Sequence, residues 1–379
     1  MQVGETIYLD YQASTPVDER VLKVMQEASV TLFANPHAVD HALGWHAAAA
    51  IEKAALQVGN LFGLQGDDVI FTSGASEANA MVFRTAQAIA ERSQRTEILI
   101  GAADHGSILN EAKYSGFVTR FIALNDCGAP DPEHLKTLLS DATALVSIVG
   151  VNNENGEIAD LRAISDICRS SGVLFHADLA QAPLAMDLDL LDLDIALATI
   201  SAHKLYGPKG VGALLTGPGA SGMVKPVVIG AGQQGGRRGG TMPTELIVGF
   251  GEACRLVGEI GKTERESLAC IRDLFVRKLE EKQTATLVGT LECRHPGNAL
   301  MRFQGRDASD LLARLQPQIA ASTQSACSSG SIEPSHVLQA MGFDHQMASE
   351  CIRFSFGRFS TVQQVSAAIG VLSAALELP

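Results

Sequence analysis

Two apolar segments of the chain each end in a residue that can do chemistry. One begins at Val173 and ends at Asp178, and the other ends at His203-Lys204. A carboxylate and a primary amine at the ends of neighbouring strands are what a pyridoxal phosphate site requires. The carboxylate keeps the pyridine nitrogen protonated, and the amine bonds to the cofactor's aldehyde. Taken singly, each residue has an ordinary explanation: Asp178 as a helix cap and Lys204 as a surface residue. The prediction of a pyridoxal phosphate site therefore depends on the two together.

A cysteine among small residues strengthens the prediction of a pyridoxal phosphate enzyme. Cys327 lies in segment 325–331, whose other residues are Ser, Ala and Gly. A cysteine acts as a nucleophile in its thiolate form, and short side chains suit a loop that must carry this thiol between two positions. The alternative is a small packing residue. Together with Lys204 and Asp178, the thiol favours an enzyme with a covalent sulfur step.

A candidate phosphate site precedes both segments. Residues 73–76 (SGAS) follow an apolar run and open a helix, so they offer backbone N–H groups and a hydroxyl to an anion. His203 and the hydroxyl of Thr241 are further candidate donors. A Ser before a Glu is also an ordinary helix start, and a flexible loop is the alternative for the glycine-rich residues 230–240.

Strands and helices alternate around these residues. We expect strands at 70–72, 97–101, 118–124, 144–151, 173–177 and 195–200, with helices at 78–92, from about 107, at 132–140 and at 160–171. This alternation predicts an α/β fold with a mainly parallel sheet covered by helices on both faces. Ligands bind beyond the carboxyl ends of such strands. The predicted strand ends carry residues 72–76, His105, Asn153, Asp178 and His203-Lys204.

The pattern changes after about residue 245. A long helix is expected at 246–281, followed by short strands at 298–304 and 351–356 with helices at 308–315, 335–341 and 361–376. This indicates a smaller α+β domain. We therefore predict a large cofactor-binding domain at 18–245, and a small domain made of 1–17 and 246–379 that carries the cysteine loop.

Composition excludes several classes of function. The net charge of −13 argues against direct binding of nucleic acid. No apolar stretch approaches the roughly 20 residues of a membrane span. The 7 cysteines form no C-x-x-C pair, which favours a reducing cytoplasm. His37, His41 and His46 have no acidic or thiol ligand close in sequence, so we expect no metal site.

The chain resembles cysteine desulfurases of the NifS/IscS type, which are fold-type I pyridoxal phosphate enzymes of the class V aminotransferase family. The resemblance extends from residue 7 to residue 359. It is carried by residues 71–77 (FTSGASE), 151–154 (VNNE), 203–210 (HKLYGPKG) and 325–335 (SACSSGSIEPS). It implies a large domain with a seven-stranded sheet, the cofactor pyridoxal 5'-phosphate and a homodimer.

The resemblance also implies a role for each matching residue. Lys204 forms the covalent link to the cofactor, Asp178 pairs with the ring nitrogen, Gln181 bonds the ring hydroxyl and His105 stacks on the ring. Ala75, Ser76, Ser201 and His203 hold the phosphate, with Thr241 reaching in from the other subunit. Asn153 and Arg353 bind the substrate carboxylate, and Cys327 takes the sulfur.

These roles predict release of sulfur from L-cysteine, giving L-alanine and a persulfide on Cys327 for a protein acceptor. Iron–sulfur assembly, tRNA thiolation and DNA phosphorothioation are possible destinations. The alternatives are a selenocysteine lyase or another class V enzyme, and a catalytically silent binding partner. The chain departs from the usual family pattern at Asn155, at Thr323-Gln324 and at residues 235–238, which bears on substrate and acceptor preference.

Overall fold

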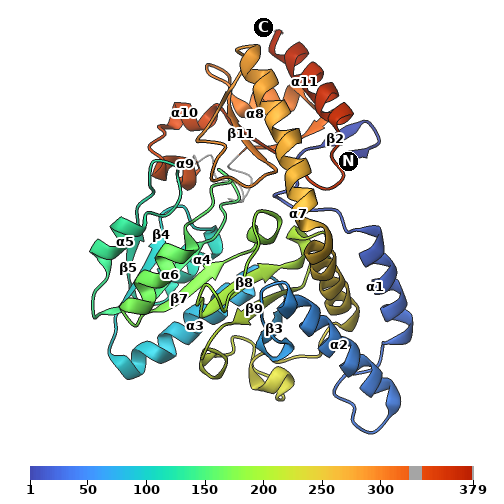
Figure 1. The fold of residues 1–379 in the computed structure, drawn as a ribbon, viewed down its shortest axis with the longest axis vertical. Helices are drawn as coiled ribbons and strands as arrows, with labels where there is room; N and C mark the ends of the chain where they lie inside the picture. Colours follow the sequence, from blue (N-terminus) through green and yellow to red (C-terminus); the bar gives the residue numbers. More distant parts are fainter. Residues whose placement is uncertain (324–334, 378–379) are drawn as a thin grey trace.

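The computed structural model describes residues 1–323 and 335–377. Its largest element is a seven-stranded sheet (Figure 1), which confirms the predicted α/β fold. In spatial order the strands are β3 (Val69–Thr72), β9 (Gly212–Thr216), β8 (Leu197–Ser201), β7 (Leu174–Asp178), β6 (Thr143–Val149), β4 (Glu97–Gly101) and β5 (Val118–Ile122).

Most of the sheet is parallel, as the alternation of strands and helices predicts. Neighbouring strands from β8 to β5 run parallel to one another. The strand that sequence reasoning missed, β9, is antiparallel to both β8 and β3. It follows β8 after a short connection that contains no α-helix, so the alternation of strands and helices does not mark it.

Side chains alternate between the two faces of the sheet. In β4, Ile98 and Ile100 belong to one buried cluster and Leu99 belongs to another. Helices α3 (Ala75–Ser93) and α4 (Gly106–Tyr114) cover the first face. The second is covered by α2 (Ala42–Asn60), α5 (Pro132–Leu138), α6 (Leu161–Ser170) and the first half of α7 (Thr244–Glu281).

The long helix α7 joins the two parts of the molecule (Figure 1). Phe250 and Cys254 in its first half pack in the core of the large sheet, whereas Leu268 and Phe275 pack in a separate apolar cluster. That second part contains a sheet in the order β10 (Thr286–Leu287), β11 (Asn298–Arg302), β14 (Cys351–Ser355) and β13 (Ser322–Thr323). Its helices are α8 (Ala308–Arg314), α9 (His336–Ala340), α10 (His345–Ser349) and α11 (Val362–Glu377).

The amino-terminal segment runs between these two parts. Strand β1 (Gln2–Val3) pairs with β2 (Thr6–Tyr8), which also pairs with β12 (Ile319–Ala320). Asp10 then bridges to Ser355 of β14, and Thr15 donates its amide to the carbonyl of His203 at 2.9 Å. Helix α1 (Glu19–Thr31) follows and contacts α7. The domain boundaries given above stay a prediction.

Among the described helices, none has the length and apolar character that crossing a membrane would need.

Candidate active site

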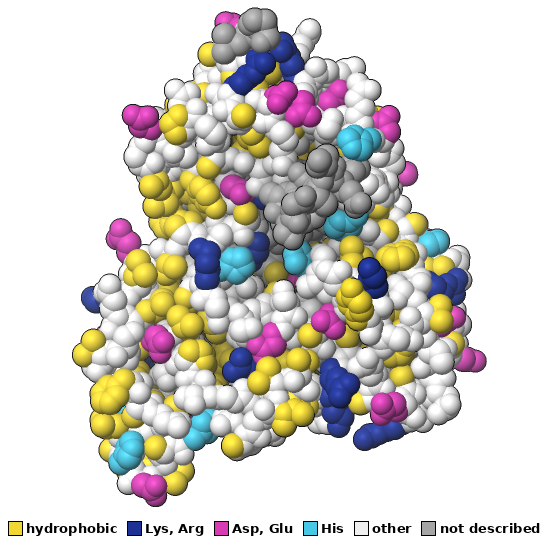
Figure 2. Space-filling view, turned by 180° about the vertical axis from the view of Figure 1, so that it is seen from behind, with side chains coloured by type: hydrophobic (Ala, Val, Ile, Leu, Met, Phe, Trp, Pro, Cys, Tyr) yellow, Lys and Arg dark blue, Asp and Glu magenta, His cyan; other side chains and the backbone are white. Residues whose placement is uncertain are grey.

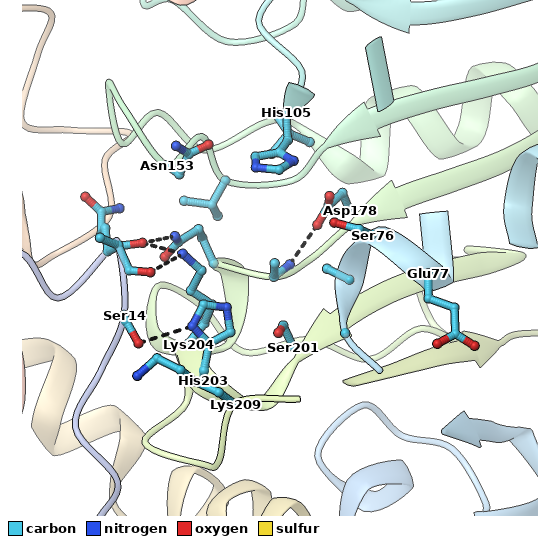
Figure 3. A pocket seen from close by; sticks show the side chains of 18 of the residues that line it. Ser14, Ser76, Glu77, His105, Asn153, Asp178, Ser201, His203, Lys204 and Lys209 are labelled. Atoms are coloured by element: carbon cyan, nitrogen blue, oxygen red, sulfur yellow. Dashed lines mark hydrogen bonds between the residues drawn. The ribbon is translucent and has the colours of Figure 1, made fainter. Parts of the chain in front are cut away.

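A cavity of about 490 Å³ lies where the parallel strands end. Figure 2 shows the surface hollowed near the middle of one face, with basic and histidine side chains around the hollow. Figure 3 shows the lining residues around one open space, with His105 and Asp178 on one side and His203 and Lys204 on the other. The cavity is therefore at the position that the rule for parallel sheets predicts.

The structure brings almost all the predicted site residues to this cavity. They are Ala75, Ser76, His105, Asn153, Asp178, Gln181, Ser201, His203, Lys204 and Arg353. Thr241 is exposed and does not line the cavity of its own chain. Cys327 lies outside the described residues.

Asp178 is held rigidly at the end of β7. It is 3% exposed, and its two carboxylate oxygens accept hydrogen bonds from Asn79 Nδ2 (3.0 Å) and the amide of Ala180 (3.1 Å). Asn79, which projects from α3, also donates to Ser107 Oγ at 2.9 Å. These bonds fix the direction of the carboxylate, as a partner for a protonated ring nitrogen requires.

Lys204 stands on the opposite side of the cavity, in a short 3-10 helix over Ala202–Lys204 that follows β8. Its ammonium group donates to the carbonyls of Gln12 (2.6 Å) and Ala13 (2.9 Å). Gln181 also donates to the carbonyl of Gln12, at 2.8 Å. The amino-terminal segment thus holds the amine in the cavity.

The predicted phosphate site is the beginning of α3. Helix α3 starts at Ala75 after Gly74, which has no side chain to cap it, so the first-turn N–H groups face the cavity without intrahelical acceptors. The neighbouring Gly212 must be glycine, because a Cβ there would lie 2.8 Å from Gly74 Cα. Burial and the nearby Lys204 and Lys209 lower the pKa of His203 to about 4. An arriving phosphate would oppose that effect.

An ion pair supports this helix start. Glu77 accepts hydrogen bonds from the amide of Ser73 (2.7 Å) and from Arg238 Nε (2.9 Å). Arg238 belongs to the glycine-rich residues 230–240. In the same stretch, Gln234 Oε1 accepts a hydrogen bond from the amide of Phe71 in β3 at 2.7 Å, and its Nε2 donates to the carbonyl of Phe71 at 2.9 Å. Residues 230–240 are thus bonded to the edge strand and to α3.

His105 caps α4 from the edge of β4. Its Nδ1 accepts a hydrogen bond from the amide of Ser107 at 3.2 Å. His105 is exposed and its side chain lines the cavity, where desolvation lowers its pKa. The preceding Asp104 is fully buried and accepts from the amides of Gly101 (3.1 Å) and Val149 (2.7 Å). Burial raises the pKa of Asp104 well above its usual value.

Arg353 reaches the cavity from β14 in the second part of the molecule. It is 4% exposed, and it donates to Asp10 Oδ1 and to the carbonyl of Asn153, both at 2.6 Å. Asn153 sits in a turn that Asn152 holds by accepting from the amide of Glu154 at 2.8 Å. A guanidinium beside an amide suits a carboxylate ligand.

This donor set fits pyridoxal phosphate. The start of α3 with Ser201 and His203 can hold a phosphate, Asp178 a ring nitrogen, and Lys204 an aldehyde carbon, all around one cavity. No cluster of three metal-ligating side chains occurs within residues 1–323 and 335–377. His41, one of the three histidines weighed above as metal ligands, instead caps α2: its Nδ1 accepts a hydrogen bond from the amide of Gly44 at 3.1 Å.

Comparisons with known proteins agree with this geometry. The family model for class V aminotransferases matches residues 7–368. Cysteine desulfurase IscS of Rickettsia felis is 36% identical over 377 residues, which cover 98% of this chain and 91% of that protein. A NifS-like protein from Rickettsia africae has a solved structure with a TM-score of 0.88 and 28% identity, covering 98% of this chain and all of that one (100%). The structure described as SspA in complex with cysteine has a TM-score of 0.82 and 28% identity, covering 94% and 100%.

The chain therefore belongs to the class V aminotransferase family. The resemblance to cysteine desulfurases of the NifS/IscS type, read first from its motifs, is confirmed over nearly the whole chain.

Sequence reasoning missed four residues that shape the site: Asn79, Asp104, Asp10 and Gln12. Asn79 had a signal, because it is a polar residue among the buried residues Ala78, Met81 and Val82 of one helix. Asp104 directly precedes His105 at a strand end, which was also visible. Asp10 and Gln12 act through contacts with β14 and β11, far away in sequence, and no local pattern shows those contacts.

Proposed function

We propose that this protein is a pyridoxal-phosphate-dependent cysteine desulfurase. One observation carries the proposal: the amine of Lys204, the carboxylate of Asp178 and the start of α3 surround a single cavity, which Arg353 enters from the other part of the chain. Relatives named cysteine desulfurase, 36% identical over nearly the whole chain, support the same activity.

The proposed roles follow from where each side chain lies. When bound, pyridoxal phosphate supplies an aldehyde that links to amines and a ring that accepts electrons from the substrate. Asp178, fixed by Asn79, keeps a proton on the ring nitrogen. Lys204 would hold the cofactor covalently and would move the proton at the substrate Cα. Ala75, Ser76, Ser201 and His203 bind the phosphate, and His105 covers the ring.

The substrate is positioned from both parts of the molecule. Arg353 and Asn153 bind the α-carboxylate of L-cysteine, and Gln181 orients the ring hydroxyl. The thiolate of Cys327 attacks the substrate sulfur. An S–S bond forms as the substrate's C–S bond breaks, and the carbon takes up a proton. One enzyme thiol and one L-cysteine thus give one enzyme persulfide and one L-alanine, with no other oxidant or reductant.

The wider setting is also part of the proposal. We place the enzyme in the cytoplasm as a homodimer, with Thr241 completing the phosphate site of the other subunit, because Thr241 is exposed and away from its own cavity. The persulfide passes to a protein acceptor. The net charge of −13 favours a protein acceptor over direct contact with nucleic acid.

The test is to follow both products from L-cysteine, with sulfide measured under a thiol reductant and L-alanine measured separately. We expect equal amounts of the two from the wild type. Cys327→Ser should keep the bound cofactor and its colour, but should lower sulfide production by at least about 100-fold, because a hydroxyl is a far poorer nucleophile toward sulfur. Near-normal sulfide from this variant would favour a lyase that needs no thiol. Absence of both products from the wild type would favour a silent binding partner.

A further inference from the structure

A chain of hydrogen bonds fixes the orientation of the Gln12 side-chain amide. Arg294 Nη1 donates to Asn298 Oδ1 at 2.7 Å. An arginine can only donate, so the other end of the Asn298 amide must be its NH₂ group. That group donates to Gln12 Oε1 at 2.6 Å. Gln12 therefore uses its oxygen as an acceptor and must present Nε2 as a donor in another direction.

This Nε2 group is buried and lacks an acceptor within the part of the chain that the structure describes. Gln12 is 2% exposed, and among the described residues nothing accepts a hydrogen bond from its Nε2. Leaving a buried donor without a partner costs about 1–3 kcal/mol. Gln12 lines the active-site cavity, so a ligand in that cavity can supply the missing acceptor.

The neighbours of Gln12 indicate what that ligand is. The backbone amide of Gln12 donates to Ser355 Oγ at 3.0 Å, and Arg353 lies two residues earlier on the same face of β14. Arg353 Nε is a second buried donor without an acceptor among the described residues, and Arg353 lines the same cavity. Two unsatisfied donors on residues that line one cavity suit a group with two acceptor oxygens.

The ion pair of Arg353 with Asp10 makes hydrogen-bond donors important for binding an anion in this cavity. Asp10 already pairs with Arg353 at 2.6 Å, so the guanidinium charge is largely offset before any ligand arrives. An incoming carboxylate therefore gains more from added hydrogen-bond donors than from net charge. Gln12, held by Arg294 and Asn298, is a donor whose direction is set in advance.

We propose that Gln12 Nε2 donates a hydrogen bond to the α-carboxylate of the amino-acid substrate and helps the enzyme to select amino acids over simple amines. The inference rests on the proposed function for the identity of the substrate as an amino acid. It adds a residue from the amino-terminal segment to the carboxylate site, and it makes Asn298 a positioning residue that acts through Gln12.

The experiment compares a ligand that has the carboxylate with one that lacks it. Cofactor-loaded wild type and Gln12→Glu are titrated with L-alanine and with ethylamine, and the change in cofactor absorbance gives each dissociation constant. Glutamate keeps the length and the acceptor but replaces the donor by an oxygen. We expect L-alanine to bind about 10- to 100-fold more weakly to the variant, whereas the affinity for ethylamine changes less than about twofold. KM for L-cysteine should rise with L-alanine's dissociation constant.

Controls separate this role from a structural one. Gln2→Glu makes the same change in an exposed glutamine outside the cavity and should behave as the wild type. If Gln12→Glu does not fold, Gln12→Met, which lacks both the donor and the new charge, provides the same comparison. Equal weakening of L-alanine and ethylamine would overturn the proposal, as would unchanged binding of both. Because L-alanine binding is measured without turnover, a wild type that bound L-alanine but released no sulfide would refute the desulfurase activity and leave the Gln12 result valid.

Discussion

A histidine buried in the centre of the large sheet should make the stability of the protein depend on pH. His176 lies two residues before Asp178 in β7. It is fully buried, and its ring nitrogens bond to Ser147 Oγ in β6 (2.8 Å) and Thr199 Oγ1 in β8 (3.0 Å). Burial lowers the pKa of His176 to about 4 from its ordinary value of 6.5, although the nearby Asp178 opposes the shift. The neutral ring is therefore part of what holds together the three strands that deliver Asp178 and Ser201.

The sign of the effect follows from proton binding. Between about pH 4 and pH 6.5 the unfolded chain binds a proton at this histidine and the folded chain does not, so stability rises with pH across that window. With those two pKa values, acidification from about pH 7.5 to about pH 5 removes roughly 2 kcal/mol from the free energy of unfolding. Above pH 7 the contribution of His176 is constant.

The perturbation is His176→Gln, which keeps hydrogen-bonding capacity but cannot take up a proton in this range. Urea unfolding of wild type and variant at the two pH values gives four free energies. We expect the loss on acidification to be about 2 kcal/mol smaller in the variant. His37→Gln, which changes an exposed histidine, should lose as much stability as the wild type. Equal pH dependence in wild type and His176→Gln would refute the reasoning, because it would mean that the ring is protonated in the folded sheet.

Two further predictions concern the cofactor and assembly. Lys204→Ala should lose the covalently held cofactor and its visible absorbance, because the proposal assigns the link to the aldehyde to this amine. Lys209→Ala, which changes a second lysine that lines the cavity, should keep its colour. An unchanged spectrum in Lys204→Ala contradicts the assignment. Sedimentation at working concentration should show a homodimer. Thr241→Ala should weaken cofactor binding by roughly tenfold, which is the value of one hydrogen bond to a charged group, and should leave the dimer intact. A fully active monomer would exclude a phosphate site shared between subunits.

The part of the site built on the parallel strands was predictable from sequence. Parallel strands end at one edge of their sheet, so polar residues that follow apolar runs, such as Asp178, His105 and Lys204, must come together there. β9 was not predictable in this way, because it reverses direction after a short connection without an α-helix. Thr241 and Cys327 were assigned by resemblance alone, and their roles stay predictions.

The part of the active site that the amino-terminal segment builds could not be predicted, because its contacts join residues that are far apart in the sequence. The carbonyls of Gln12 and Ala13 hold Lys204, Asp10 holds Arg353, and the Gln12 side chain is oriented by Asn298. Each of these contacts joins residues about 190 to 340 positions apart, so no local period or spacing encodes them.

The same contacts show why one segment serves both halves of the site. The amine of Lys204 belongs to the large sheet, and the guanidinium of Arg353 belongs to the small one. A segment that bonds to both helps to set the distance between the amine that holds the cofactor and the guanidinium that holds the substrate carboxylate. Residues 10–13 bond to both, through Asp10 at one end and the carbonyls of Gln12 and Ala13 at the other. Substitutions that shift this segment should therefore alter binding of substrate amine and carboxylate together, whereas the change of one donor atom in Gln12→Glu should alter the carboxylate alone.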